Sequence, residues 1–341
     1  MAGDQQAPGQ YPVQQAYSPQ PGRPVAKPRK LPTEPAPYQH LLRGPAFRWW
    51  KPLLVVLLAV AFALLAQVLL TIIWLVLAVA TGGDMMSFFN GLSLTGPMDA
   101  LTFSYVTAGL IAFIPSAMFA NWIVHGIRPG YLSSVAGRIR WRWLLRCVAF
   151  TVPVFVVYMA LQFVIGWEYG PRPPQWVALL IIVVIAIPFQ SAGEEYAFRG
   201  LILQNVGGWF RHPVVALVVS IIPSVLLFAL AHGSLDIWIL CDLAIFATAA
   251  CLLTWRTGGM EAAIVLHATN NVLIMISTIL FGGWEAAFIS TDSEGSPLAV
   301  LMSLVVESIV VALILWQAKR LGIQHLYQPS GVAIQPAAAA R

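Results

Sequence analysis

The stretch Val177–Arg199, VALLIIVVIAIPFQSAGEEYAFR, runs from an almost wholly apolar segment directly into three ionisable side chains. These are Glu194, Glu195 and Arg199. The apolar part can form most of a membrane span, because crossing the hydrocarbon core takes about 20 apolar residues. Charged side chains in or beside the bilayer core cost free energy and therefore usually have a function. The stretch predicts a transmembrane helix that carries a polar site.

The composition of the whole chain is that of a polytopic membrane protein. Its 341 residues are 59% hydrophobic and 10% charged, whereas globular domains carry about 25% charged residues. Eight apolar runs approach the length of a span, so we predict an all-α transmembrane bundle of about eight spans. The predicted spans are roughly Pro52–Ala80, Leu101–Val124, Leu144–Gly166, Val177–Gln204, Pro213–Ala231, Leu235–Trp255, Gly259–Gly282 and Pro297–Trp316.

The basic residues predict how this bundle is oriented. Lys and Arg gather in the N-terminal segment, the second loop and later even-numbered turns, while the odd-numbered loops are mainly acidic. Because cytoplasmic loops carry the excess of Lys and Arg, both termini are predicted to be cytoplasmic. The basic residues are divided among loops beside the membrane, so we expect membrane lipid rather than nucleic acid as a partner. The alanine-rich spans and the Pro/Gln-rich tail indicate a bacterial cytoplasmic (inner) membrane, and the sequence does not indicate an oligomeric state.

The first polar motif places two carboxylates and an arginine within six residues. Glu195 and Arg199 are four residues apart with the acid first, the favourable order for a helical ion pair. That pair leaves Glu194 without its own counter-ion. Because adjacent helical residues diverge by about 100°, we expect the two carboxylates not to share one partner. A carboxylate in a poorly solvated cavity holds a proton more tightly, which suits a general base.

Two further motifs lie on apolar segments downstream. Phe228 and His232, and likewise His267 and Asn271, are spaced i, i+4 on one helix face. Each alone has a structural alternative, such as an interfacial histidine or a polar link between helices. Together they supply parts for activating water. Zinc could be held by Glu194, His232 and His267. Alternatively, Glu194 acts as base without a metal while the His and Asn side chains stabilise an oxyanion.

Helix lengths put these groups at different depths. Glu194 lies ~26 Å along a span that starts at Val177, and His232 lies ~29 Å along a span that starts at Pro213 in the opposite direction. The groups can meet only if helices tilt strongly, break or have other boundaries.

The ordered motifs EExxxR, FxxxH and HxxxN resemble those of the CPBP intramembrane proteases, which include the type II CAAX prenyl endopeptidases and bacterial Abi-domain proteins. In this chain they read Glu194–Arg199, Phe228–His232 and His267–Asn271. The resemblance covers roughly residues 175–275 and implies a peptidase in which the first glutamate activates water. The two histidines and the asparagine would complete the site, and the second glutamate and the arginine would hold the motif helix. The resemblance leaves open whether a metal takes part.

The leading hypothesis is an integral-membrane endopeptidase that cleaves a peptide or membrane-protein substrate with glutamate-activated water. The predicted catalytic residues are Glu194, His232, His267 and Asn271, supported by Glu195, Arg199 and Phe228. Two alternatives remain, a non-catalytic immunity or scaffold protein and a proton-coupled transporter that uses the same side chains as a relay.

The chain divides into five predicted parts. Residues 1–40 hold nine Pro and seven Gln and cannot bury enough apolar surface to fold, so we predict a disordered cytoplasmic tail over residues 1–45. The following parts are N-terminal transmembrane helices (46–175), a catalytic transmembrane core (176–282), a last transmembrane helix (283–320) and a short cytoplasmic tail (321–341).

Overall fold

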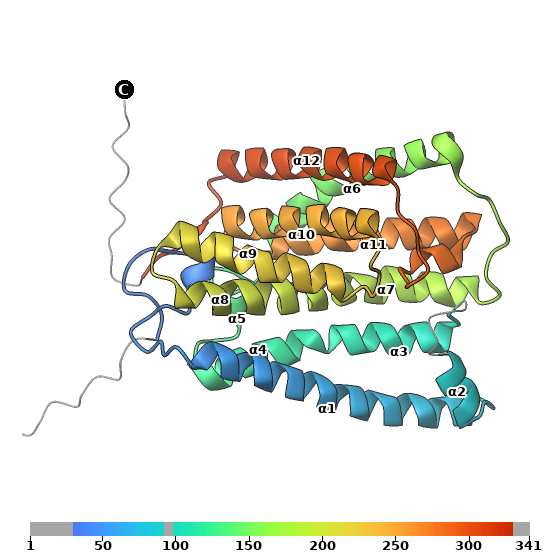
Figure 1. Cartoon of the computed structure of the whole chain (residues 1–341), viewed down its shortest axis with the longest axis horizontal. Coiled ribbons are helices and arrows are strands. Elements are labelled where there is room, and N and C mark those ends of the chain that lie inside the picture. The colour runs from blue at the N-terminus through green and yellow to red at the C-terminus, as the bar shows by residue number, and fades with distance from the viewer. Residues whose placement is uncertain (1–29, 92–97, 330–341) are drawn as a thin grey trace, which may run out of the picture.

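The computed structural model describes residues 30–91 and 98–329 and shows a bundle of long helices that run roughly side by side (Figure 1). The predicted all-α class is confirmed. The helices are α1 (Lys51–Ala80), α2 (Met85–Gly91), α3 (Ala100–Ile111), α4 (Phe113–His125), α5 (Gly130–Ser133), α6 (Trp141–Gly166), α7 (Trp176–Glu195), α8 (Leu203–Trp209), α9 (Pro213–Leu230), α10 (Ile237–Thr257), α11 (Glu261–Phe281) and α12 (Pro297–Arg320). The shorter elements are β1 (Ala36–Pro37), η1 (Tyr38–His40), the π-helical η2 (Tyr196–Ile202), η3 (Trp284–Ala287) and β2 (Leu326–Tyr327).

Eight stretches of the described residues are long and apolar enough to cross a membrane, which confirms the predicted number. Two stretches are composite: α3 and α4 form Ala100–His125, and α7, η2 and α8 form Trp176–Trp209. The outer surface is apolar, since Leu57, Leu64 and Val164 are 66%, 63% and 83% exposed. A surface of this kind is suited to lipid rather than water. The chain is an integral, multi-pass membrane protein.

Residues 30–45, which the composition predicts to be disordered, are folded against the bundle. β1 pairs antiparallel with β2. Tyr38 and Leu41 are fully buried, and the Tyr38 hydroxyl donates to the carbonyl oxygen of Leu132 at 2.5 Å. An average over a Pro-rich segment conceals these few large apolar side chains, which bury enough surface once the bundle provides a partner. The rest of the predicted tail, residues 1–29, lies outside the described residues.

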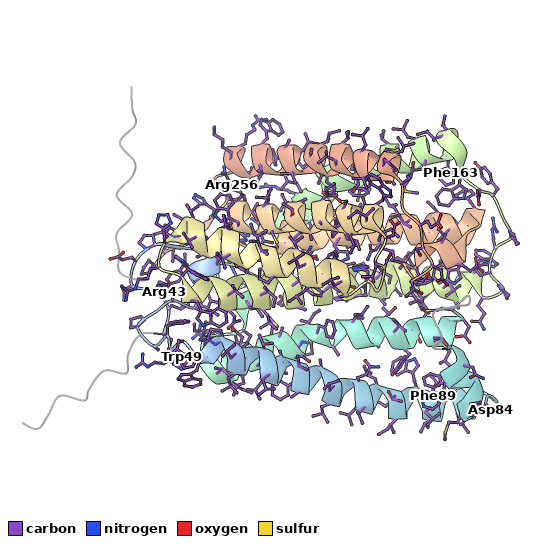
Figure 2. All side chains as sticks on the ribbon, viewed as in Figure 1. Arg43, Trp49, Asp84, Phe89, Phe163 and Arg256 are labelled. Atoms are coloured by element: carbon purple, nitrogen blue, oxygen red, sulfur yellow. The ribbon has the colours of Figure 1, made fainter. Side chains whose placement is uncertain are left out.

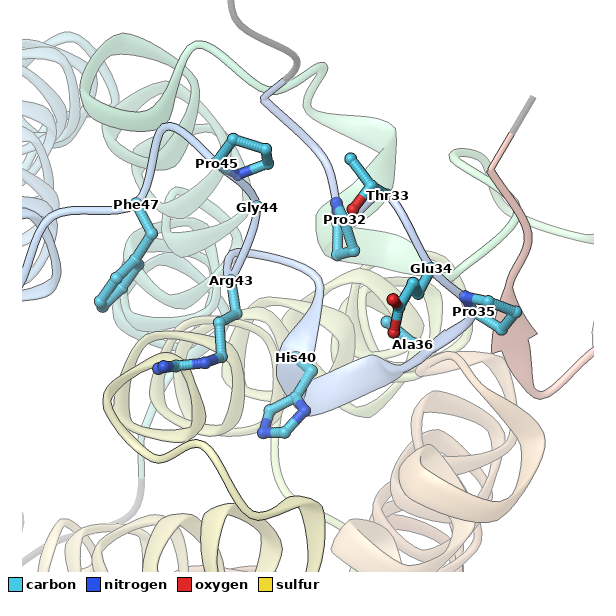
Figure 3. A pocket seen from close by; sticks show the side chains of 10 residues that line it. All are labelled: Pro32, Thr33, Glu34, Pro35, Ala36, His40, Arg43, Gly44, Pro45 and Phe47. Atoms are coloured by element: carbon cyan, nitrogen blue, oxygen red, sulfur yellow. The ribbon is translucent and has the colours of Figure 1, made fainter. Parts of the chain in front are cut away.

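The folded N-terminal segment lines an open hollow of about 440 Å³ (Figure 3). All of its lining residues lie between Pro32 and Phe47, and His40 and Arg43 line it together. Burial, and then the positive charge of Arg43, lowers the pKa of His40 from its usual value. None of the three motifs contributes a residue to this hollow, so their site lies elsewhere in the molecule.

The two segments that flank the bundle lie at the same end of it, as the β1–β2 pairing requires (Figure 1). Arg43, Trp49 and Arg256 lie at that end, whereas Asp84 and Phe163 lie at the opposite end (Figure 2). An even number of spans, with basic residues beside both flanking segments, agrees with the charge pattern of the sequence. That this end faces the cytoplasm remains a prediction.

Candidate active site

The fourth span changes helix type at the first motif. α7 ends with Glu194 and Glu195, and the chain continues through the π-helical η2 and α8 to Trp209. π-Helical segments are rare and occur frequently at functional sites. Because the span extends over 34 residues, Glu194 lies near its middle rather than near one end. α9 stops well short of the opposite end of the bundle, so the end of α9, two residues before His232, lies toward mid-depth (Figure 1).

A close helix contact fixes the position of the first motif. Gly193 packs against α3 so tightly that a β-carbon there would lie 2.1 Å from the carbonyl oxygen of Leu110. A larger side chain would push α7 and α3 apart. The absence of a side chain at residue 193 therefore sets how far Glu194 stands from the neighbouring helix.

The predicted ion pair between Glu195 and Arg199 is present and fully buried. Arg199 Nη1 lies 3.0 Å from Glu195 Oε1, and neither side chain is exposed. The guanidinium carbon of Arg199 also lies 4.3 Å from the centroid of the Phe228 ring, a favourable cation–π contact when it is shielded from water. The pair and the aromatic ring hold η2 against α9.

His267 contacts both carboxylates, contrary to the expectation that they have separate partners. Its Nδ1 lies 2.8 Å from Glu195 Oε1, and its Nε2 lies 3.8 Å from Glu194 Oε2. The helical divergence of the two glutamates still holds, but an imidazole has nitrogens on two edges and can reach both. Because a buried carboxylate beside a guanidinium acts as an acceptor, Nδ1 carries a hydrogen and Nε2 is the nitrogen that faces Glu194.

Gln190 belongs to the site and is missing from the sequence-based set. It is 6% exposed, and its amide nitrogen donates to Glu194 Oε1. Its amide oxygen faces Asn271 Nδ2 at 3.5 Å and Ser191 Oγ at 3.3 Å. The signal in the sequence was present, because Gln190 precedes Glu194 by four residues and interrupts an apolar run. Through Gln190, the structure connects Glu194 to Asn271.

His232 is placed beside Phe228 and apart from the other motif side chains in the hydrogen-bond network. Its Nδ1 lies 2.8 Å from the carbonyl oxygen of Phe228, so this nitrogen carries the hydrogen. The Phe228 ring is 4.8 Å from the His232 ring and 5.7 Å from the His267 ring, measured between centroids. Phe228 is buried, and its ring lies against both histidine rings.

The metal-ligand set considered from the sequence is not assembled. Among the described residues, no group of three or more His, Cys, Asp or Glu side chains is arranged to hold a metal ion. His267 has the hydrogen-bonding pattern of a ligand, with one nitrogen held by a carboxylate, and Glu194 lies beside the other nitrogen. His232 does not complete a set with them. The described residues do not fit a zinc site in this arrangement.

Residues 173–273 match the family model of the Rce1-like type II CAAX prenyl endopeptidases. This segment is similar to that family. The Rce1-like segment contains all three motifs and confirms the family resemblance at this level. The uncharacterized protein YyaK of Bacillus subtilis (strain 168) is 26% identical over 155 residues, 43% of this chain and 50% of that protein. The chain thus matches about half the length of this curated relative. No solved structure matches the chain.

Proposed function

We propose that the protein is an intramembrane endopeptidase whose Rce1-like core hydrolyses a peptide bond with water activated by Glu194. The observation that carries the proposal is the contact set around this carboxylate at mid-span. Gln190 donates to one oxygen of Glu194, and His267 Nε2 faces the other at 3.8 Å. A carboxylate held in this way needs no further rearrangement to accept a proton.

The separation between Glu194 and His267 suits a shared water molecule. At 3.8 Å the two groups are too far apart for a direct hydrogen bond, and a water that donates to Glu194 Oε2 is within reach of His267 Nε2. Glu194 takes a proton from this water as the water oxygen attacks the substrate carbonyl carbon. Glu194 then returns the proton to the leaving nitrogen as the carbon–nitrogen bond breaks.

The remaining polar side chains would stabilise the oxyanion. Asn271 Nδ2 is a donor in every protonation state and reaches the site through its contact with Gln190. His232 has its Nδ1 hydrogen committed to the Phe228 carbonyl, so its Nε2 donates only from a protonated ring. We assign Asn271 as the principal oxyanion donor and His232 as a secondary donor.

Glu195, Arg199 and Phe228 would position the reacting groups without touching substrate. Glu195 fixes the His267 ring through Nδ1, and Arg199 neutralises Glu195. Phe228 packs on the guanidinium and on both histidine rings. Residues 176–282 accordingly form the catalytic core, in a protein that we place in a bacterial cytoplasmic membrane with peptide or membrane-protein substrates.

The decisive test compares cells that carry the wild type, Glu194→Gln, or Glu168→Gln at matched expression. Glu168 is an exposed acid in a loop, so its variant controls for the loss of one carboxylate. New peptide termini in the membrane proteome should appear with the wild type and the Glu168→Gln protein and be absent with Glu194→Gln. Purified wild type in liposomes should then cleave the candidate substrate. Retained turnover in Glu194→Gln would exclude Glu194 as the base.

The strain comparison and one further assay separate the other classes of function. A scaffold or immunity protein predicts that Glu194→Gln rescues every phenotype of a deletion, with identical termini in all strains. A proton-coupled transporter predicts uptake into proteoliposomes that collapses with the proton gradient.

A further inference from the structure

A second cavity lies between the ends of α10 and α12, at the end of the bundle where the flanking segments meet. Its volume is about 790 Å³, within the range of small-ligand sites. The lining includes Trp255, Arg256, Leu315, Trp316, Lys319 and Ile323. α10 and α12 run alongside each other there, with α12 at the outer edge of the bundle (Figure 1).

The wall of this cavity that follows α12 is held in place by contacts from elsewhere in the chain. Arg140 Nη1 donates to the carbonyl oxygens of Gln324 and Thr257, at 2.8 and 2.9 Å. β2, directly after, pairs with β1. At Gly258 a β-carbon would lie 2.7 Å from His325 Cα. The cavity is therefore formed by fixed backbone rather than by mobile side chains alone.

The cavity combines cations that have no carboxylate partner among the described residues with apolar surface. Arg256 and Lys319 are exposed, and no carboxylate of the described residues lies within ion-pair distance of either. The acid nearest in sequence to this corner, Glu261, is already paired with Arg140 at 2.6 Å. The indole rings of Trp255 and Trp316 supply the apolar part, and Trp316 is 48% exposed.

These features define one class of ligand. An anion with long apolar chains would neutralise both cations and cover the tryptophan rings at once. Trp residues gather at the boundary between lipid and water, and basic pockets between transmembrane helices bind anionic lipid head groups. A zwitterionic lipid is a poorer fit, because its ammonium group would meet two cations.

We propose that this cavity is a binding site for one anionic glycerophospholipid. The phosphate contacts Arg256 and Lys319, and the acyl chains lie along Trp316 and the outer face of α12. Because this site shares no residue with the motifs, the proposal does not depend on the proposed peptidase activity.

Native mass spectrometry of the full-length protein in detergent tests the site, with phosphatidylglycerol and phosphatidylcholine of identical acyl chains as probes. The variant Arg256→Gln/Lys319→Gln removes both cations. The control Arg48→Gln/Arg211→Gln removes two exposed cations outside the cavity. We expect the cavity variant to bind one phosphatidylglycerol about 30-fold more weakly than the wild type does. The control and the conservative variant Arg256→Lys/Lys319→Arg should bind as the wild type does.

Three results would overturn the proposal. The first is equal phosphatidylglycerol binding by the wild type and the cavity variant. The second is phosphatidylcholine binding to the wild type as tightly as phosphatidylglycerol. The third is displacement of the lipid by millimolar inorganic phosphate, which would show that the cavity holds an anion and makes no use of acyl chains. Thermal unfolding of each variant without lipid verifies that all three double variants are folded.

Discussion

The adjacent glutamates should respond very differently to the same substitution. Glu195→Gln keeps the shape of the side chain but leaves the Arg199 guanidinium buried and unpaired, because both side chains are fully inaccessible. Removing one partner of a buried ion pair costs about 3–5 kcal/mol. The Phe228 ring, 4.3 Å from the guanidinium carbon, still faces the charge and offsets part of this cost. We therefore expect Glu195→Gln to lower the unfolding free energy by about 3 kcal/mol, the lower end of this range. This corresponds to a factor of roughly 100 in the folding equilibrium.

Glu194→Gln is the matched control. The Glu194 side chain is 11% exposed and has no arginine partner among the described residues. Its replacement keeps an oxygen that accepts from Gln190, so the unfolding free energy should fall by about 1 kcal/mol or less. Cleavage should nevertheless be lost in this variant, because an amide cannot accept the proton from water.

The measurement is equilibrium unfolding in mixed micelles with increasing dodecyl sulfate, followed by near-ultraviolet circular dichroism. A third protein, Glu195→Gln/Arg199→Met, removes the unpaired charge and should recover to within about 1 kcal/mol of the wild type, since replacing a whole buried pair with apolar groups is often neutral. Equal losses for the two single variants would refute the reasoning. So would a double variant as unstable as Glu195→Gln, because the cost would then not arise from the orphaned guanidinium.

Three further predictions concern Gln190, Gly193 and His40, whose contacts or burial are seen only in the structure. Gln190→Leu removes the amide that donates to Glu194, so kcat/KM in liposomes should fall about 10–100-fold while the unfolding midpoint changes little; unchanged turnover would remove Gln190 from the site. Gly193→Ala forces a β-carbon onto the α3 backbone and should lower the unfolding free energy by about 1–3 kcal/mol, whereas an unchanged value would show that the helices separate freely. The pKa of His40 is lowered on folding, so the unfolded state binds its proton first. Stability of the N-terminal segment is full above a pH of about 6.5 and falls as the pH drops through the folded-state pKa. The hydrogen-exchange protection of residues 36–42, relative to the intrinsic exchange rate at each pH, should therefore decrease at acidic pH, and His40→Gln should remove that dependence; identical protection profiles for the two proteins would contradict it.

The parts of the site that could be predicted from the sequence are those set by one helix. The pairing of Glu195 with Arg199 follows from a spacing of four residues, and the eight spans follow from apolar length. Contacts between helices could not be predicted in this way. Nothing in the spacing of the motifs indicates that His267 reaches both glutamates or that Gln190 links Glu194 to the seventh span. The folded segment around Tyr38 was hidden for a similar reason, since its stability comes from a surface that the distant parts of the chain provide.

The depth of the site shows how a boundary error changes a functional argument. Counting residues from a span that ends near Gln204 puts Glu194 close to one membrane surface, where a solvated acid would need no explanation. The continuation of the helix through η2 to Trp209 places the same carboxylate near mid-span, where an ionised side chain is costly unless other groups stabilise it. Those groups form one connected path: Arg199 neutralises Glu195, Glu195 holds His267, and His267 faces Glu194. Glu195 thus has a task beyond its helical ion pair: besides balancing the buried Arg199 guanidinium, it fixes which imidazole nitrogen of His267 carries the hydrogen. A glutamine at residue 195 can still accept from that nitrogen but cannot balance the charge, which is why we expect the ion pair, rather than the orientation of His267, to dominate the stability of this site.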